Sequence, residues 1–236
     1  MLRLSSPVPF AAALSVALPH GIVVGVHLPG TGAPVPPEVL AALHPEERAF
    51  AETLHGFRQE AYVGGRMALA TCIAELGARG RAVPVGARGE PVLPAGIVGS
   101  VSHKRDLAVA VAARAGSSLG LGVDLEDVGP PREGVARRVL RAEELTAVDV
   151  LPEDRRWVDV LTRFAVKEAV YKALAPTLQR MIQFEEAAVW PSPDGIDRVD
   201  LHLLGGDPRV PAPFEVEARH VWVGARVLAT VRVARR

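Results

Sequence analysis

Acidic and basic residues recur at regular spacing in two stretches of the sequence. Asp124 and Glu126 alternate with apolar residues, so in a strand their carboxylates would share one face, about 7 Å apart. Glu168 and Lys172 are four residues apart in a stretch with helical spacing, which puts them on one helix face. If this strand and this helix meet, three carboxylates and a lysine come together. Such a set of oxygen ligands suits a hard divalent cation that also holds a substrate phosphate.

Each pattern taken alone has an ordinary structural explanation. An Asp-x-Glu pair on a strand is usually solvated, and a Glu/Lys pair four residues apart is usually a surface ion pair. Together with Ser102-His103 upstream, however, the order and spacing resemble the 4′-phosphopantetheinyl transferases of the Sfp-like and enterobactin-synthase component D-like type. That family carries a G-x-D-x-E strand followed by an F-x-x-K-E-A-x-x-K helix. Both motifs are complete here, at residues 122–126 and 164–172.

The order of expected elements suggests two similar halves. Each half has a strand, then a helix, then a pair of strands, and we place the boundary near Gly116. The elements are expected at 21–28, 57–76 and 98–113 in the first half and at 120–126, 155–175 and 214–233 in the second. The resemblance implies an α+β fold of two similar halves in a pseudo-twofold arrangement, with the active site between them. Residues 1–115 would form the coenzyme A 3′-phosphate side, and residues 116–236 the metal and pyrophosphate site.

Local signals refine these elements. Gly77 is expected to end the helix that starts at Phe57, and Gly64-Gly65 inside it indicates close approach to another element or to a ligand. Pro176 is expected to end the motif helix. We further expect one helix at 134–148, a meander of strands around 98, 107 and 120, and strands at 188–190, 199–204, 214–218, 220–225 and 226–233.

The resemblance also implies the chemistry and the residues that perform it. The family transfers the 4′-phosphopantetheine arm of coenzyme A to a serine of an apo acyl or peptidyl carrier protein and releases adenosine 3′,5′-bisphosphate. Asp124, Glu126 and Glu168 match its Mg²⁺ ligands, with Mn²⁺ as an alternative ion. Glu168 also matches the general base, acting directly or through a metal water, and Lys172 matches the lysine on the pyrophosphate.

Other residues match the family's coenzyme A contacts. His103 corresponds to a phosphate donor, Ser102 to a backbone contact with the nucleotide, and Arg66 to the residue that binds the 3′-phosphate. Arg58 is a second candidate for the 3′-phosphate, with a solvated helix face as the alternative. Lys167 is either structural or near the phosphates.

One position departs from the family pattern. Several members carry a basic residue just before the proline that corresponds to Pro91, where it contacts coenzyme A. Glu90 occupies that position here, and Arg88 could reach the site in its place.

An arginine-rich region is a candidate surface for the acidic carrier protein; dispersed solvated arginines are the alternative. Its residues are Arg132, Arg137, Arg138, Arg141, Arg155, Arg156 and Arg163. The resemblance leaves the pathway open among siderophore peptide, polyketide and fatty-acid synthesis. The size and the two-half pattern favour the broad-specificity type, which implies a monomer.

Composition limits the other classes of function. The chain has 236 residues, with 27 Lys+Arg and 27 Asp+Glu, and this zero net charge argues against bulk nucleic-acid binding. Its single cysteine, Cys72, excludes an internal disulfide and fits a cytoplasmic protein. Prolines interrupt the apolar run at 8–18, so we expect neither a signal peptide nor a membrane span.

Two other functions stay open beside the transferase. A non-catalytic coenzyme A-binding module would need Arg66 and His103 but not the carboxylates. A metal-dependent phosphohydrolase would use the same acidic cluster with water as the nucleophile.

Overall fold

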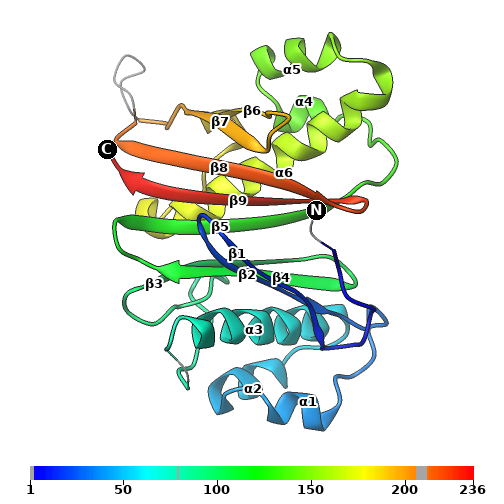
Figure 1. The fold of residues 1–236 in the computed structure, drawn as a ribbon, viewed down its shortest axis with the longest axis vertical. Coiled ribbons are helices and arrows are strands. Elements are labelled where there is room, and N and C mark those ends of the chain that lie inside the picture. The colour runs from blue at the N-terminus through cyan, green and yellow to red at the C-terminus, as the bar shows by residue number, and fades with distance from the viewer. Residues whose placement is uncertain (1–2, 79, 206–211) are drawn as a thin grey trace. The chain divides into compact units, whose positions relative to one another are not determined.

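The protein consists of two compact units, Met1–Gly116 and Ser117–Arg236. The computed structural model describes residues 3–78, 80–205 and 212–236, and each unit is treated by itself below. Each unit contains one long helix packed against an antiparallel sheet, which is an α+β architecture (Figure 1).

The first unit is built on a four-stranded antiparallel sheet. Its strands, in spatial order, are β1 (Ala12–Leu18), β2 (Gly21–His27), β4 (Leu107–Arg114) and β3 (Ile97–His103). Helix α3 (Phe57–Glu75) packs on β2 and β4, and the short helices α1 (Pro37–Ala41) and α2 (Pro45–Ala51) precede it. The interface of α3 with the sheet is filled by small and medium apolar residues such as Val24, Leu69 and Ala110.

Two glycines allow α3 to lie close to its surroundings. A Cβ at Gly64 would lie 2.2 Å from the Leu28 side chain, and one at Gly65 would lie 2.8 Å from Val101. These distances are shorter than van der Waals contact. The expected close approach of another element to this glycine pair is therefore confirmed.

The second unit contains a five-stranded antiparallel sheet with helix α6 (Glu153–Leu178) against it. The strands, in spatial order, are β5 (Ser118–Asp127), β9 (Arg226–Arg235), β8 (Phe214–Val223), β7 (Ile196–Leu201) and β6 (Ala187–Trp190). Ala165, Ala169 and Ala173 of α6 join valines and alanines of β9 in a fully buried core. Helices α4 (Val135–Val139) and α5 (Ala142–Asp149) and the 3₁₀ turn η1 (Phe184–Glu186) complete this unit.

Three expectations about these elements were wrong. The strand near residue 120 does not extend the β3–β4 hairpin into a meander, because both edges of β4 are already paired and β5 pairs with β9. The single helix expected at 134–148 is two helices, because Leu140 is extended and the Glu144 carboxylate accepts the Arg141 amide at the start of α5. Pro176 does not end α6, which stops only where Gln179 takes a left-handed conformation with φ of 51°.

Two boundaries in the C-terminal strands also moved. Residues 214–223 form one continuous strand, although a break was expected after residue 218. The strand expected at 199–204 lies at 196–201.

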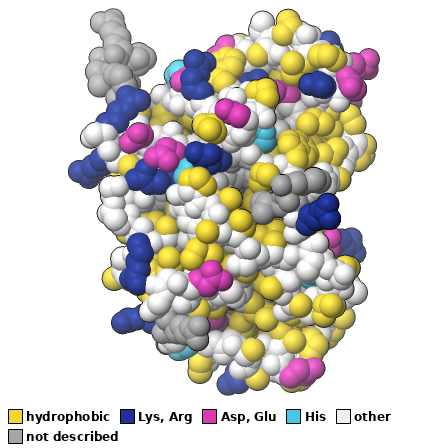
Figure 2. Space-filling model, in the orientation of Figure 1, with side chains coloured by type: hydrophobic (Ala, Val, Ile, Leu, Met, Phe, Trp, Pro, Cys, Tyr) yellow, Lys and Arg dark blue, Asp and Glu magenta, His cyan; other side chains and the backbone are white. Residues whose placement is uncertain are grey.

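The surface carries both signs of charge. On the face in Figure 2, basic and acidic side chains are interspersed, as the zero net charge would suggest. Among the residues that the structure describes, no helix combines the length and the apolar character needed to cross a bilayer.

Candidate active site

Strand β5 and helix α6 are in direct backbone contact, and two glycines make this possible. A Cβ on Gly122 would lie 1.8 Å from the Ala169 carbonyl oxygen, and one on Gly120 would lie 2.0 Å from that of Ala173. Because side chains alternate along a strand, the next positions on this helix-facing side are Asp124 and Glu126. The glycines thus bring the acidic end of the strand to the motif helix.

An ion pair joins the two motifs directly. The Lys172 ammonium lies 2.7 Å from Asp124 Oδ1 and also donates to the Val123 carbonyl oxygen at 3.0 Å. Asp124 is only 5% exposed, so this pair is much less screened than a surface ion pair. The predicted meeting of the Asp124 strand and the Lys172 helix is therefore present in the structure.

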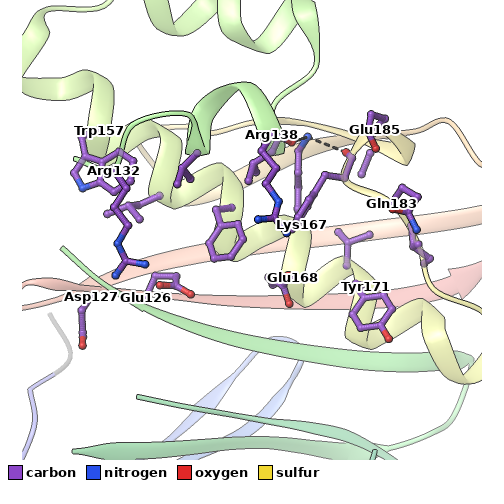
Figure 3. A pocket seen from close by; sticks show the side chains of 18 of the residues that line it. Glu126, Asp127, Arg132, Arg138, Trp157, Lys167, Glu168, Tyr171, Gln183 and Glu185 are labelled. Carbon is purple, nitrogen blue, oxygen red and sulfur yellow. Dashed lines mark hydrogen bonds between the residues drawn. The ribbon is translucent and has the colours of Figure 1, made fainter. Parts of the chain in front are cut away.

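A pocket of about 710 Å³ lies beside this contact, entirely within the second unit. Glu126 of β5 and Glu168 of α6 both line it, and Arg132 and Arg138 line it from the segment that follows β5 (Figure 3). Much of the remaining wall is apolar or aromatic. That part includes Val135, Val139, Trp157, Leu161, Phe164, Tyr171, Ile182 and Phe184.

The three predicted metal ligands are divided between the Lys172–Asp124 ion pair and the pocket. Across the described ranges, no three acidic, histidine or cysteine side chains lie close enough together to hold a metal ion. Asp124 pairs with Lys172, whereas Glu126 and Glu168 line the pocket. Two carboxylates still fit Mg²⁺, because this ion commonly takes only one or two from the protein and completes its shell with phosphate and water.

Lys167 lines the pocket from α6, although its side chain is only 3% exposed. Its ammonium donates to Glu144 Oε2 at 2.6 Å and to the carbonyl oxygens of Val139 and Phe184 at 2.8 and 3.0 Å. Burial lowers the pKa of Lys167, while the Glu144 carboxylate opposes that shift. Of the two alternatives for this lysine, these contacts favour the structural one.

Arg66 lies on α3 in the first unit. It is 5% exposed, and its guanidinium carbon is 4.6 Å from the centre of the Tyr62 ring, which in turn packs on Phe50. Its Nε has no hydrogen-bond partner among the described residues. Burial raises the pKa of Tyr62, and the charge of Arg66 acts in the opposite direction. Arg58 is exposed on the same helix, as a solvated residue would be.

The remaining candidates of the first unit lie on β3 and in the loop before it. Ser102 is buried and His103 is exposed at the end of β3. Arg88 is exposed, its amide donates to Glu90 Oε2 at 2.9 Å, and its guanidinium is 3.8 Å from that carboxylate. The acidic residue that departs from the family pattern is therefore partly neutralised by its neighbour.

Two family models match the sequence, one in each unit. The "4'-phosphopantetheinyl transferase N-terminal domain" matches residues 46–113, and the "4'-phosphopantetheinyl transferase superfamily" matches residues 120–231. The 4'-phosphopantetheinyl transferase Npt of Nocardia iowensis is 33% identical over 161 residues, which cover 65% of this chain and 68% of that protein. The chain belongs to the 4′-phosphopantetheinyl transferase superfamily. It is an enzyme of this type.

Other similar proteins have comparable coverage. The 4'-phosphopantetheinyl transferase Svp of Streptomyces mobaraensis is 31% identical over 162 residues, which are 67% of this transferase and 65% of Svp. The matches thus span about two thirds of the length of these relatives. The solved holo-[acyl-carrier-protein] synthase of Thermotoga maritima is 25% identical, with a match that covers 50% of this chain and 65% of that chain at a TM-score of 0.41.

Sequence reasoning missed two parts of the site. The first is the role of Gly120 and Gly122 in the contact of β5 with α6. The second is the pocket wall on α6, although its residues follow helical spacing and could have been found by it. That stripe is Trp157, Leu161, Phe164, Glu168 and Tyr171.

Proposed function

We propose that this transferase moves the 4′-phosphopantetheine group of coenzyme A to a serine of an apo acyl or peptidyl carrier protein and releases adenosine 3′,5′-bisphosphate. One observation carries the proposal. In the unit that matches the superfamily model, Glu126 and Glu168 line one pocket, and the Lys172–Asp124 pair joins the elements that bear them. This arrangement offers both carboxylates and a cation to a pyrophosphate.

The carboxylates serve two purposes in this proposal. Glu126 and Glu168 would hold Mg²⁺, with Asp124 as the third predicted ligand. When bound, the ion supplies positive charge against the pyrophosphate oxygens. Glu168 accepts the proton of the carrier serine, directly or through a water, as the serine oxygen bonds to phosphorus. The bond from that phosphorus to the bridging oxygen breaks, and adenosine 3′,5′-bisphosphate leaves with the bond electrons.

Lys172 is proposed as the cation that stabilises the leaving group, adenosine 3′,5′-bisphosphate. Its ammonium would contact the pyrophosphate and neutralise the charge that develops on the leaving oxygen. Asp124 holds this ammonium at 2.7 Å, which limits the orientations of a flexible side chain. Orienting it before the substrate binds reduces the entropy lost in reaching the transition state.

The pocket suits the uncharged part of coenzyme A. Its volume of about 710 Å³ lies within the range of small-molecule sites, roughly 300–1,000 Å³. Trp157, Phe164 and Phe184 give it an aromatic wall, while Arg132 and Arg138 stand on its charged side. We assign the pantetheine arm to the aromatic wall and a phosphate to the charged side.

The first unit would hold the nucleotide end of coenzyme A. Arg66 is proposed for the 3′-phosphate, since a guanidinium with an unpartnered buried Nε gains from an anion. His103 and Ser102 are proposed for the nucleotide phosphate and the base side. Arg58 and Arg88 are weaker candidates because both are exposed, and Arg88 already pairs with Glu90.

Not every arginine of the arginine-rich region is available to a partner protein. Arg163 is 4% exposed and pairs with Asp159, so it is not available to a carrier protein. Arg156 uses its guanidinium on the carbonyl oxygens of Asp149 and Leu151. We propose that exposed members of the region dock the acidic carrier. Of these, Arg137 and Arg155 lie outside the pocket lining and are assigned to docking, whereas Arg132 and Arg138 line the pocket and stay assigned to a phosphate.

We also propose that the enzyme acts as a monomer in the cytoplasm and serves a specialised pathway such as siderophore synthesis. Burial raises the pKa of the Cys72 thiol to about 12, so this cysteine stays protonated at neutral pH. A protonated, buried thiol supports a structural role over a redox one.

Light scattering tests the proposed monomeric state, and a panel of carrier proteins tests the proposed pathway.

The activity can be tested by incubating the protein with coenzyme A, Mg²⁺ and apo carrier proteins of the three pathway types, followed by intact mass measurement of the carrier. A gain of one phosphopantetheine supports the proposal. Free phosphopantetheine with an unmodified carrier would indicate a phosphohydrolase, and binding without turnover would indicate a coenzyme A-binding module.

Variants make this test specific to the site. Glu168→Gln should lower kcat about 100-fold or more, the usual contribution of a general base. Glu126→Gln should shift the Mg²⁺ dependence of the rate to higher concentrations. Glu133→Gln removes an exposed carboxylate from outside the pocket lining and serves as the control. Glu133→Gln should retain full activity, and if Glu168→Gln and Glu126→Gln did so as well, the assignment of the carboxylates would be wrong.

A further inference from the structure

A second charged cluster lies at the pocket wall in the second unit, and one of its members, Lys167, is itself a lining residue. It consists of Glu144 on α5 with Lys167 and Arg163 on α6, all of them at most 4% exposed. The Glu144 carboxylate is 2.6 Å from the Lys167 ammonium and 3.7 Å from the Arg163 guanidinium. Buried charges are costly unless their partners are well placed, so such a cluster needs an explanation.

Every hydrogen-bonding group of the Lys167 ammonium is occupied. An ammonium has three N–H donors. Here they meet three acceptors, namely Glu144 Oε2 and the carbonyl oxygens of Val139 and Phe184. A direct contact with a substrate phosphate would require one of these bonds to break.

The two carbonyl acceptors belong to the pocket wall. Val139 ends α4 and Phe184 begins η1, and both residues line the pocket. They are 45 positions apart in the sequence and come from separate segments, so the position of one segment is not fixed by its covalent connection to the other. Lys167 therefore fastens two sides of the wall to the same point of α6.

Glu144 extends this connection to two further backbone groups. Its Oε2 accepts the amide of Arg141, which starts α5, and its Oε1 accepts the amide of Val189 in β6. Arg163 donates to the carbonyl oxygen of the same Val189. The pair thus joins α4, α5, η1 and β6 to α6 through hydrogen bonds that are buried or partly buried.

We infer that Lys167 and Glu144 are a positioning pair that sets the shape of the substrate pocket by holding the wall segments of Val139 and Phe184 on α6. Lys167 acts through these wall residues and does not contact the substrate. The inference rests on the proposed function only in assigning the pocket to the pantetheine arm of coenzyme A.

The inference predicts which part of coenzyme A loses affinity. Lys167→Met should raise the Kd for coenzyme A about tenfold in calorimetric titrations and change the Kd for adenosine 3′,5′-bisphosphate less than twofold, because only the first ligand has the arm. Where transfer is measurable, the KM for coenzyme A should rise by a similar factor, with kcat within threefold of the wild type. The affinity loss should persist in 1 M NaCl, since it does not come from a lost charge contact.

A double variant separates the loss of positioning from the cost of leaving a buried carboxylate unpaired. Lys167→Met alone leaves the Glu144 carboxylate buried with its main partner removed, whereas Lys167→Met with Glu144→Gln leaves a neutral pair. The double variant should therefore be more stable than Lys167→Met alone, but it should still bind coenzyme A about tenfold more weakly than the wild type, because it also lacks the ammonium that holds Val139 and Phe184. It also keeps the test possible if the single variant does not fold.

Hydrogen exchange gives a readout that does not depend on activity. In Lys167→Met, exchange should accelerate at residues 135–144 and 183–189 and stay unchanged in β5, β8 and β9. His220→Gln is the matched control, because it breaks the buried pair with Asp197 at 2.9 Å, and neither residue lines the pocket. It should alter neither the exchange of the wall segments nor the Kd for coenzyme A.

Two results would overturn the inference. One is unchanged exchange of both wall segments in Lys167→Met. The other is an equal loss of affinity for both ligands that disappears at high salt, which would identify Lys167 as a phosphate contact. If the wild-type protein transferred no phosphopantetheine and bound no coenzyme A, the proposed function would fail, while the exchange data would still decide the role of the pair.

Discussion

The contact of β5 with α6 depends on the absence of a side chain at Gly122, so Gly122→Ala should damage both stability and activity. The added Cβ would lie 1.8 Å from the Ala169 carbonyl oxygen and 2.7 Å from its carbonyl carbon. Both are backbone atoms, which cannot rotate away as a side chain can. The strand and the helix must therefore separate.

The size of the effect follows from these distances. Moving from 1.8 Å to an ordinary contact of about 3.5 Å requires a displacement of about 1.7 Å. Overpacking of this kind costs about 3 kcal/mol, at the upper end of the usual range. For a unit of this size that corresponds to a fall in Tm of roughly 10 °C. The same displacement would stretch the 2.7 Å contact between Lys172 and Asp124, and a misplacement of about 1 Å can lower a rate about 100-fold.

Thermal unfolding followed by circular dichroism and the carrier-mass assay measure the two effects in one preparation. Gly129→Ala is the control for stability alone, because a Cβ there meets nothing within 4 Å and the residue does not have a positive φ, whereas its place in the pocket lining makes it unsuitable as an activity control. It should leave the Tm within about 1 °C of the wild type. A Gly122→Ala variant with the Tm and activity of the wild type would refute the argument that close backbone contact builds this site.

Two further predictions concern other parts of the second unit. The Arg180 guanidinium lowers the pKa of Glu186 to about 2, so the folded protein should lose about 2 kcal/mol of stability as the pH falls from about 4.5 to about 2; this value is reduced because Arg180 is partly exposed. Urea unfolding across this range should show a smaller pH dependence for Glu186→Gln. Arg137→Glu combined with Arg155→Glu should raise the KM for the carrier protein about tenfold and leave the KM for coenzyme A unchanged, measured by steady-state kinetics, if these exposed arginines dock an acidic partner.

Each of these predictions has a result that contradicts it. An unchanged pH dependence in Glu186→Gln would mean that its ion pair does not contribute to acid stability. For docking, Arg235→Glu with Arg236→Glu is a matched charge change at the C-terminus. Docking at the arginine-rich region is excluded if both double variants raise the carrier KM equally.

Local patterns in the sequence located the elements that carry the motifs. The helical spacing after Phe57, with Gly77 beyond its end, predicted α3 nearly to the residue, and the apolar runs flanking residues 103–106 predicted the β3–β4 hairpin. These signals are local because capping and alternation depend on neighbours in the chain. The predictions that were wrong concern contacts between segments that are distant in the sequence. The pairing of β5 with β9 joins strands 99 or more residues apart, and no local pattern specifies that choice.

The candidate site divides in the same way. The G-x-D-x-E and K-E-A-x-x-K spacings predicted which side chains share a face, and the family resemblance that they supported is confirmed by the family models. The roles of the individual site residues stay predictions. The tertiary structure added that Asp124 pairs with Lys172 while Glu126 and Glu168 line a pocket. Spacing along one strand does not predict which side chains contact Asp124 and which line the pocket with Glu126, because those contacts depend on where α6 and the segment after β5 are packed.

Lys167 shows most clearly what could not be predicted from the sequence. In the sequence it is one of two lysines in the F-x-x-K-E-A-x-x-K motif, and the resemblance left open whether it is structural or near the phosphates. Its three acceptors come from α4, α5 and η1, which are separated from it by between 17 and 28 residues. The sequence by itself determined the motif residues and, through their resemblance to a known family, the family, since motifs consist of residue types at fixed spacing. Only the tertiary structure decided which charges are buried together, because burial is a property of packed segments and not of their order.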